Sequence, residues 1–559
     1  MIKIRVISDG SSGKEHESGL TRYVLPAVPQ AVLQRHGARV LRPAEAAVAK
    51  GWPKPNPTIY RYGVLLVPRR LLDSATIVTL NRVLTDVGMR LVRPDATDDQ
   101  PATSDDDLDA KLPVAVELGV AGTFKPQAVD AWTALQRLRA EVTALREACD
   151  SGASTDTAAL ESLAGVVDAI SLDHLLVGSA TDGSSSTIVT GTNTASNGNP
   201  DLNNLFDRPA AGTSGRIPVT VALADPGQIY MGQNASRRPV VAVLDTGIAC
   251  DPEHPWLTPR VERGANGHED AVVIVDTELQ KQLEAEHVGE RLLSIASYAD
   301  EPSIEEPLLG DLSTHAGHGT FIAGLIRQLA PGAQIYAVRV MQPDGFAPGS
   351  DVVNALKKIA YRVRRAQSGQ ADGQAVDVVS LSLGYFDESA DERNVTIALE
   401  PVLRELTELG VTVVAAAGNF ATSRKFLPAA LTEKLTDKAA APMISVGSLN
   451  PNGSTSRFSN EAPWVTCYAS GAAIVSTFPA FAGAQNAPAR TGRRESFDPD
   501  DFASMFGVWS GTSFAAPVIA GLVAARLHDE AGRHDRDQNS AARVAAAHAA
   551  WENVLKDAR

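Results

Sequence analysis

The stretch VVAVLDTGI at 240–248 decides the fold of the larger part of the chain. Its first five residues are all apolar, and a polar cluster with a glycine follows at once. A continuous apolar run of this length is typical of a strand that is buried on both faces, as in a parallel sheet covered by helices on both sides. The sequence therefore predicts an α/β domain in which this stretch is a strand of the main sheet.

Similar apolar runs recur further along the chain, separated by segments with helical spacing. The apolar runs lie at 271–275, 335–340, 376–381, 411–417 and 443–447, and the helical segments at 318–329, 350–365, 395–409 and 513–527. Buried strands that alternate with helices predict a three-layer domain with a mostly parallel sheet. We expect this domain to span 235–535 and a C-terminal helix to occupy 536–559.

A smaller α+β domain is expected over residues 1–175. The patterns predict, in chain order, a strand at 64–68, a helix at 72–88, strands at 90–93 and 113–117, and helices at 127–149 and 157–170. The first three of these form a β-α-β unit. The following residues, 176–234, are rich in Gly, Ser, Thr and Asn and predict a polar flexible linker.

Composition limits the partners and the compartment of the chain. Its 559 residues include 66 Asp and Glu against 51 Lys and Arg, and the formal net charge of -15 opposes attraction to nucleic acid and to anionic membranes. Three distant cysteines, Cys149, Cys250 and Cys467, do not suggest a disulfide framework or a zinc site. No apolar run of signal-peptide or membrane-spanning length is present, so we expect a cytoplasmic protein without nucleic-acid or membrane partners.

Reactive residue types stand where strands end and helices begin. Asp245 and Asn419 follow apolar strands, and the carboxyl ends of parallel strands meet at one edge of a sheet. His318 and Ser513 stand near the starts of two helices, each preceded closely by glycine. A serine hydroxyl needs an adjacent base, and the base needs an orienting acid, so these side chains together could form a nucleophilic site. The amide of Asn419 and the backbone N–H of Ser513 could face a developing oxyanion.

Five blocks of sequence carry a family resemblance. In chain order they are VAVLDTGI (241–248), GHGTFIAGLI (317–326), VVSLSLG (378–384), VVAAAGN (413–419) and GTSFAAPVIAG (511–521). Together they resemble the signature blocks of the subtilisin-like serine proteases, the S8 peptidases, over roughly 235–530. The resemblance implies a serine endopeptidase that forms an acyl-enzyme on Ser513, with His318 as proton shuttle, Asp245 as its support and Asn419 at the oxyanion.

The same resemblance implies where a protein or peptide substrate binds. The strand that pairs with the substrate backbone would be Ser382, Leu383 and Gly384. One wall of the primary side-chain pocket would be Ala416, Ala417 and Gly418. Met341 would belong to the opposite rim. The chemistry requires no cofactor or metal. Structural calcium occurs in the family, but the sequence contains no clear acidic loop with the ligand spacing for it.

Two positions depart from the family pattern. Phe321 stands where the family usually has a second histidine, and Ser470 stands where it usually has a proline. Neither departure removes a catalytic group. Substrate fit and loop packing are the properties that they could change.

The role of the N-terminal region and the activity itself leave alternatives open. Many members of the family carry a propeptide of ferredoxin-like fold, so residues 1–175 are interpreted as a regulatory or inhibitory domain, and the linker as the place where the chain is cut. The competing class of function is a binding protein that reuses the fold without catalysis.

Four further residues have two interpretations each. His315 could be a second base or a metal ligand, but a solvated loop histidine is favoured. Cys250 could be a redox-sensitive thiol, but a small buried filler is favoured. Asp387 and Glu388 could select basic side chains of a substrate, but a solvated turn is favoured.

Overall fold

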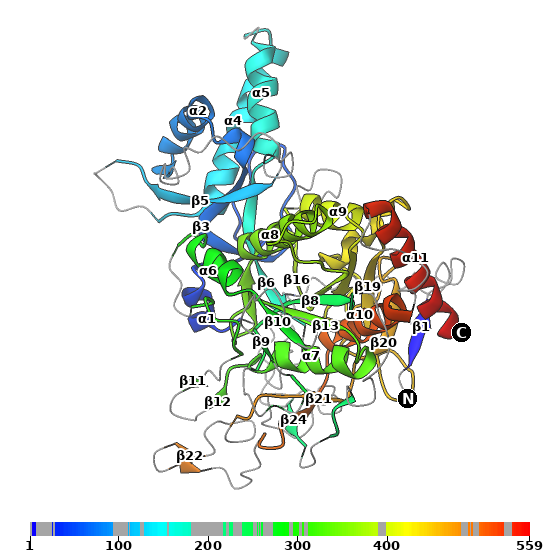
Figure 1. Cartoon of the computed structure of the whole chain (residues 1–559). Coiled ribbons are helices and arrows are strands. Elements are labelled where there is room, and N and C mark those ends of the chain that lie inside the picture. The colour runs from blue at the N-terminus through cyan, green and yellow to red at the C-terminus, as the bar shows by residue number, and fades with distance from the viewer. Residues whose placement is uncertain are drawn as a thin grey trace.

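A nine-stranded sheet forms the core of the larger part of the chain in this computed structural model (Figure 1). Its strand order is β1-β20-β19-β17-β15-β8-β13-β10-β9, and every neighbouring pair is parallel except β1 with β20. The strands are β1 (Ile4–Val6), β8 (Val240–Asp245), β9 (Pro259–Arg260), β10 (Val273–Val275), β13 (Gln334–Arg339), β15 (Val378–Leu381), β17 (Thr412–Ala416), β19 (Met443–Leu449) and β20 (Cys467–Ser470). The predicted mostly parallel sheet is confirmed.

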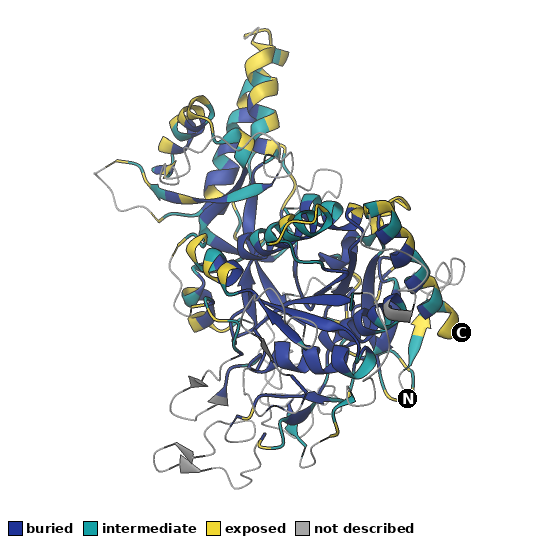
Figure 2. Ribbon diagram, in the orientation of Figure 1, coloured by how far each residue is buried: buried dark blue, intermediate teal, exposed yellow. Residues whose placement is uncertain are grey.

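Both faces of this sheet are buried, as the apolar runs predict. In β8, Val240, Ala242 and Leu244 contribute to one hydrophobic core, whereas Val241 and Val243 contribute to the other. The first core includes helices α6 (Thr277–Ala285), α8 (Gly349–Gln367) and α9 (Glu400–Glu408), and the second includes α7 (His318–Leu329), α10 (Thr512–Asp529) and α11 (Ser540–Asp557). The sheet is therefore the middle of three layers, and Figure 2 shows its central strands as buried and the edge strand β1 as partly exposed.

The N-terminal part of the chain forms an antiparallel arrangement with the strand order β6-β3-β5-β4. Its elements are α1 (Gln30–Arg35), β2 (Ala38–Leu41), β3 (Thr58–Pro68), α2 (Ser74–Thr85), β4 (Met89–Leu91), β5 (Pro113–Val120), α4 (Ala131–Asp150), α5 (Thr157–Asp168) and β6 (Ser171–Gly178). β5 lies between the two strands of the predicted β-α-β unit, which makes it the split arrangement of ferredoxin-like folds. β2 extends the sheet beside β3, and α4 and α5 form a hairpin that protrudes from it (Figure 1).

An aspartate stands directly before each of three of these helices and explains why the helix begins there. Asp73 accepts hydrogen bonds from the N–H groups of Ala75 and Thr76 at 3.0 and 2.9 Å, ahead of α2. Asp130 and Asp156 cap α4 and α5 in the same way. Such caps satisfy N–H groups that have no partner within the helix, which favours a helix start at these positions.

β6 joins the two parts of the molecule. It pairs antiparallel with β3 on the N-terminal side, and with β14 (Phe346–Pro348) and β16 (Leu383–Phe386) on the side of the larger sheet. The expected domain boundary at 175 falls inside this strand. Further along the expected linker of 176–234, Arg216 is buried and β7 (Ile217–Pro218) pairs with β24 (Phe506–Trp509). Between these ends, 180–215 lie outside the described residues.

The structure describes residues 3–6, 25, 28–92, 110, 112–122, 128–153, 156–179, 216–219, 223–226, 237–249, 254, 256–257, 259–260, 272–289, 294–300, 304–306, 311–389, 398–481, 490–491, 494–495, 502–529 and 539–558. Its remaining short elements are η1 (Arg69–Leu71), β11 (Ile304–Glu306), β12 (Asp311–Leu312), β18 (Phe426–Leu427), η6 (Ala429–Glu433), β21 (Ile474–Thr477), β22 (Arg490–Thr491) and β23 (Arg494–Glu495). Within these ranges, the helices all lack the combination of length and apolar character that crossing a membrane requires.

Candidate active site

The structure brings Asp245 and His318 into direct contact. Asp245 is the last residue of β8 and His318 is the first residue of α7, and both are buried. The Nδ1 atom of His318 lies 2.7 Å from Oδ1 of Asp245. The approach of the helix to the strand depends on glycine, because a Cβ atom on Gly319 would lie 2.1 Å from the carbonyl oxygen of Gly247.

Ser513 and Asn419 meet at the start of α10. The Oδ1 atom of Asn419 accepts hydrogen bonds from the N–H and the hydroxyl of Thr512, both at 2.9 Å. Since the carbonyl side of the amide is occupied in this way, its Nδ2 atom is directed to the other side, toward the backbone near Ser513. The hydroxyl of Thr512 also accepts from the N–H of Gly418 at 3.0 Å. Sequence reasoning missed this positioning role, although Thr512 stands inside the quoted block GTSFAAP.

A carbonyl group of the chain itself occupies the space in front of these donors. The oxygen of Ser179, directly after β6, accepts from the backbone N–H of Ser513 at 3.0 Å and from Nδ2 of Asn419. The N–H of Ser179 donates to the oxygen of Ser382 at 3.0 Å. The carbonyl of Ser179 therefore lies where two converging donors would stabilise a negative oxygen.

The strand assigned to substrate pairing does pair, and its partner is β6. Leu383 lies opposite Gly178 and Gly384 lies opposite Val177 in an antiparallel ladder. On the other edge of β6, β14 pairs antiparallel with the same segment, with Phe346 opposite Val177. β6 is therefore the middle strand of three.

The other assigned residues surround the end of β6. Ala416 ends β17, and Ala417 and Gly418 follow it toward Asn419, with the oxygen of Ala417 accepting from Nδ2 of Asn460 at 2.7 Å. Met341 is fully buried on the opposite rim, where its sulfur would lie 3.2 Å from a Cβ atom placed on Gly178.

The hydroxyl of Ser513 donates away from the histidine in this conformation. It lies 3.0 Å from the oxygen of Ser382, while the hydroxyl of Ser382 donates to the oxygen of Ser513 at 2.9 Å. Within the described residues, Nε2 of His318 is buried without a hydrogen-bond partner. This nitrogen is the free base position that the pair with Asp245 leaves open.

A second carboxylate supports the start of α7. Asp300 is buried, and it accepts from the hydroxyl of Thr320 at 2.9 Å and from the N–H of Gly317 at 3.2 Å. Burial raises the pKa of Asp300 to about 6, although both hydrogen bonds and Arg339 act to lower it and Asp245 adds to the increase. No motif in the sequence marked Asp300.

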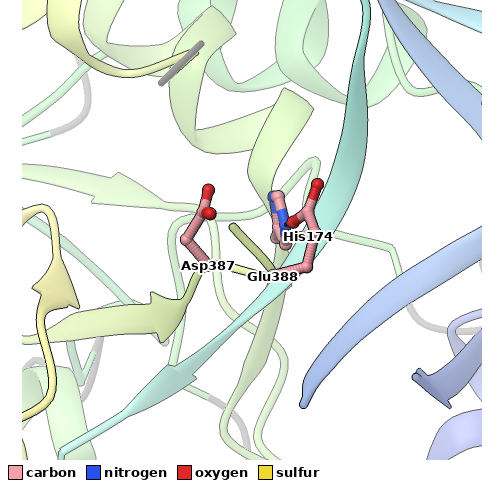
Figure 3. Close-up of side chains that lie close together, drawn as sticks. All are labelled: His174, Asp387 and Glu388. Atoms are coloured by element: carbon pink, nitrogen blue, oxygen red, sulfur yellow. Dashed lines mark hydrogen bonds and ion pairs between the residues drawn. The ribbon is translucent and has the colours of Figure 1, made fainter. Parts of the chain in front are cut away.

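Asp387 and Glu388 are not a solvated turn. Glu388 is buried, and its Oε2 atom lies 2.6 Å from Nε2 of His174 on β6, as Figure 3 shows. His174 also stacks on the ring of Tyr385 at 4.4 Å between centroids. Burial lowers the pKa of His174, but the charge and hydrogen bond of Glu388, with the charges of Asp387 and Asp173, outweigh burial and raise it overall. The turn and β6 are therefore joined by a buried ion pair.

The same three residues have the donor spacing of a metal site. His174, Asp387 and Glu388 each offer one ligand atom, and these atoms lie within 4.8 Å of one another. However, Nε2 of His174 is already hydrogen-bonded to Glu388. Burial raises the pKa of Glu388, but the charge and hydrogen bond of His174, together with the charge of Arg139, lower it overall. The interactions that the structure records are those of an ion pair across the junction.

Comparison with known proteins decides the family. The model of the subtilase family, the S8 peptidases, matches residues 236–553. The chain belongs to the subtilase family. The match covers every strand of the nine-stranded sheet except β1, helices α6 to α10, and all four residues at the junction of β8, α7, β17 and α10.

Individual relatives of this subtilase are distant. The thermophilic serine proteinase of Bacillus sp. (strain AK1) is 28% identical over 284 residues, which cover 51% of this chain and 51% of that protein. Subtilisin BL of Lederbergia lenta is 27% identical over 286 residues, which cover 48% of this chain and 82% of that protein. A solved cold-adapted subtilisin-like serine proteinase is 19% identical with a TM-score of 0.32, and covers 56% of this chain and 82% of its own.

The first departure of this subtilase from the family pattern fills an aromatic cluster. Phe321 packs against Phe514 and Trp509, with ring centroids 4.5 and 5.8 Å apart. The same two rings flank His318 at 5.3 and 5.6 Å. Phe321 thus supports the wall behind the histidine by packing rather than by a polar contact.

The second departure lies at the edge of the main sheet. The N–H of Ser470 donates to the oxygen of Lys3 at 3.0 Å, and its hydroxyl accepts from the N–H of Lys3 at 2.9 Å. A proline at 470 has no N–H and could make neither bond. The serine therefore allows β1, from the far N-terminus of the chain, to pair with β20.

Proposed function

We propose that this chain is a serine endopeptidase that is held inactive by its own N-terminal region. Ser513 attacks the carbonyl carbon of a peptide bond and transfers its proton to His318, while Asp245 orients the imidazole and balances its charge. His318 then gives the proton to the departing amine, and water hydrolyses the resulting ester. Attack requires the hydroxyl of Ser513 to rotate from the oxygen of Ser382 toward Nε2 of His318.

The observation that carries the proposal is the position of the carbonyl of Ser179. Its oxygen accepts from the N–H of Ser513 and from Asn419, the two groups that would stabilise the oxyanion. Since β6 leads into this position as the middle strand of three, residues up to Ser179 imitate a bound substrate. A chain held in this way excludes other substrates from the cleft.

The same geometry supports a site of self-cleavage. Ser179 supplies the carbonyl that faces the nucleophile, so the bond between Ser179 and Ala180 is the one that this arrangement would cut. The N-terminal fragment would then consist of residues 1–179. The cut lies within the expected linker, near its beginning.

The test compares the wild type with the Ser513→Ala variant by intact mass after incubation. Self-cleavage predicts a fragment that ends at Ser179 in the wild type only. A fluorophosphonate probe should label wild-type Ser513 once the fragment is removed. An unlabelled serine and two intact chains would refute the proposal and favour a binding protein that reuses the fold.

A further inference from the structure

His315 is buried beside the strand that occupies the cleft, which corrects the favoured interpretation of a solvated loop histidine. Only 4% of the residue is exposed. Its backbone N–H donates to the oxygen of Pro343 at 2.8 Å, and Nδ1 lies 3.0 Å from the hydroxyl of Thr314. Its ring contacts that of His318 edge to face, with centroids 5.1 Å apart. The position of the ring is therefore fixed from several sides.

The ring of His315 lies against two glycines. A Cβ atom on Gly178 would lie 2.7 and 2.8 Å from Cδ2 and Nε2 of His315. A Cβ atom on Gly345 would lie 2.2 Å from Nδ1 of the same ring. Carbon atoms in favourable contact are about 3.5–4.0 Å apart, so neither glycine could carry a side chain unless the ring moved. Since Gly345 and Gly178 face each other in neighbouring antiparallel strands, the ring covers both Cβ positions at once.

The backbone around Gly178 is held as firmly as the ring. Its N–H donates to the oxygen of Gly345 at 2.8 Å, and Gly178 lies opposite Leu383 in the ladder with β16. Met341, fully buried, closes the remaining side, with its sulfur 3.2 Å from the Cβ position. A strand that keeps these backbone bonds cannot shift to make room for a larger residue.

We propose that His315, supported by Met341, selects glycine at the residue that precedes the attacked carbonyl group. The enzyme then cuts extended polypeptide after segments such as Gly178–Ser179. This inference rests on the proposed function, because it takes Gly178 and Ser179 as the residues of a bound substrate. His315 acts by contact with the substrate backbone and has no part in proton transfer.

The selection is steric and does not depend on the charge of the ring. Burial lowers the pKa of His315 well below its ordinary value, and the neighbouring His318 and Arg216 lower it further, whereas Asp344 and the backbone of Gly178 oppose the change. The imidazole is therefore neutral at neutral pH. We expect the preference for glycine to be the same across the neutral range.

The first experiment measures kcat/KM for peptides with the sequence of residues 175–182, which is LLVGSATD. Alanine in place of Gly178 should lower kcat/KM of the wild type about 10- to 200-fold. In the His315→Ala enzyme the two peptides should lie within roughly threefold of each other. Alanine in place of Val177 is the control, and its effect should be the same in both enzymes.

The second experiment follows self-cleavage in the full chain. Gly178→Ala should slow the cut after Ser179, and the added His315→Ala substitution should restore it. Met341→Ala is the second variant, which relieves the same position without removing the ring and should restore the cut in part.

Fluorophosphonate labelling separates the two levels of the proposal. Normal labelling of Ser513 with equal cleavage of the glycine and alanine peptides by the wild type would overturn the role of His315 and leave the protease intact. Absent labelling and absent cleavage of every peptide would overturn the proposed function itself. A preference that survives both the His315→Ala and Met341→Ala substitutions would also overturn the inference.

Discussion

Replacing Ser470 by proline, the usual residue of the family at this position, should loosen the N-terminal region from the rest of the molecule. The substitution removes the N–H that donates to Lys3 and the hydroxyl that accepts from it. A hydrogen bond contributes a net of roughly 0.5–1.5 kcal/mol, so the loss of two amounts to roughly 1–3 kcal/mol. The cut fragment should then dissociate roughly 5- to 150-fold faster. Ser470→Ala keeps the N–H and is the matched control, with roughly a 2- to 13-fold effect.

Two assays check that the fragment is held most firmly with serine at 470, less firmly with alanine and least firmly with proline. After self-cleavage, dilution into a fluorogenic peptide reports dissociation of residues 1–179 as recovery of activity. In the uncut Ser513→Ala chain, hydrogen exchange of Ile4–Val6 reports opening of β1 without any need for catalysis. Equal exchange in the serine, alanine and proline forms would refute the idea that Ser470 holds β1, whatever the rate of dissociation.

Three further outcomes concern the site itself. Asn419→Ala should lower kcat about 100- to 1,000-fold. Thr512→Val should lower kcat about tenfold, because Asn419 loses one of the two hydrogen bonds to its Oδ1 atom. Steady-state kinetics checks both variants, and unchanged values would dismiss the oxyanion assignment. Because the pKa of His174 is raised in the folded chain, its ion pair stabilises the junction fully below pH 6.5 and the effect is lost as pH rises through the folded pKa. After correction for intrinsic exchange, protection of β6 against hydrogen exchange in Ser513→Ala should therefore fall with rising pH. Glu388→Gln should flatten this pH dependence. A pH dependence that the substitution leaves unchanged would contradict the role of the ion pair.

Local pattern was sufficient to predict six of the nine strands of the main sheet, all but β1, β9 and β20, and the placement of its functional residues at one edge. Each apolar run is buried on both faces, so its strand could be identified without knowledge of its neighbours. Asp245 and Asn419 end such strands, and parallel strands bring their carboxyl ends to one edge. His318 and Ser513 begin helices next to the same edge. The proximity of these residues follows from topology that the sequence expresses directly.

Contacts between segments that are far apart in the chain could not be predicted in this way. The pairing of β6 with β14 and β16 joins residues more than 150 positions apart, and nothing in LLVGS distinguishes it from another short strand. For the same reason the burial of His315 and Glu388 was missed, because their partners Gly178 and His174 come from β6. The pairing of β1 with β20 is a third case: the departure at Ser470 was visible, but its partner was not.

The cut proposed after Ser179 requires both a suitable sequence and an extended backbone. The dipeptide Gly–Ser occurs at 10–11, 178–179, 183–184, 349–350, 447–448 and 453–454, of which the first and third lie outside the described residues. Of the others, 349–350 begin α8, 447–448 lie within the buried strand β19, and Gly453 has a φ of +90° in a turn. None of these three presents an extended backbone with two free edges, which pairing with β14 and β16 requires. We therefore expect the enzyme to cut after the serine of Gly–Ser segments in unfolded proteins and to leave the same segments uncut inside helices and sheets. A folded substrate that is cut after a Gly–Ser segment within a helix as fast as its urea-unfolded form would contradict this.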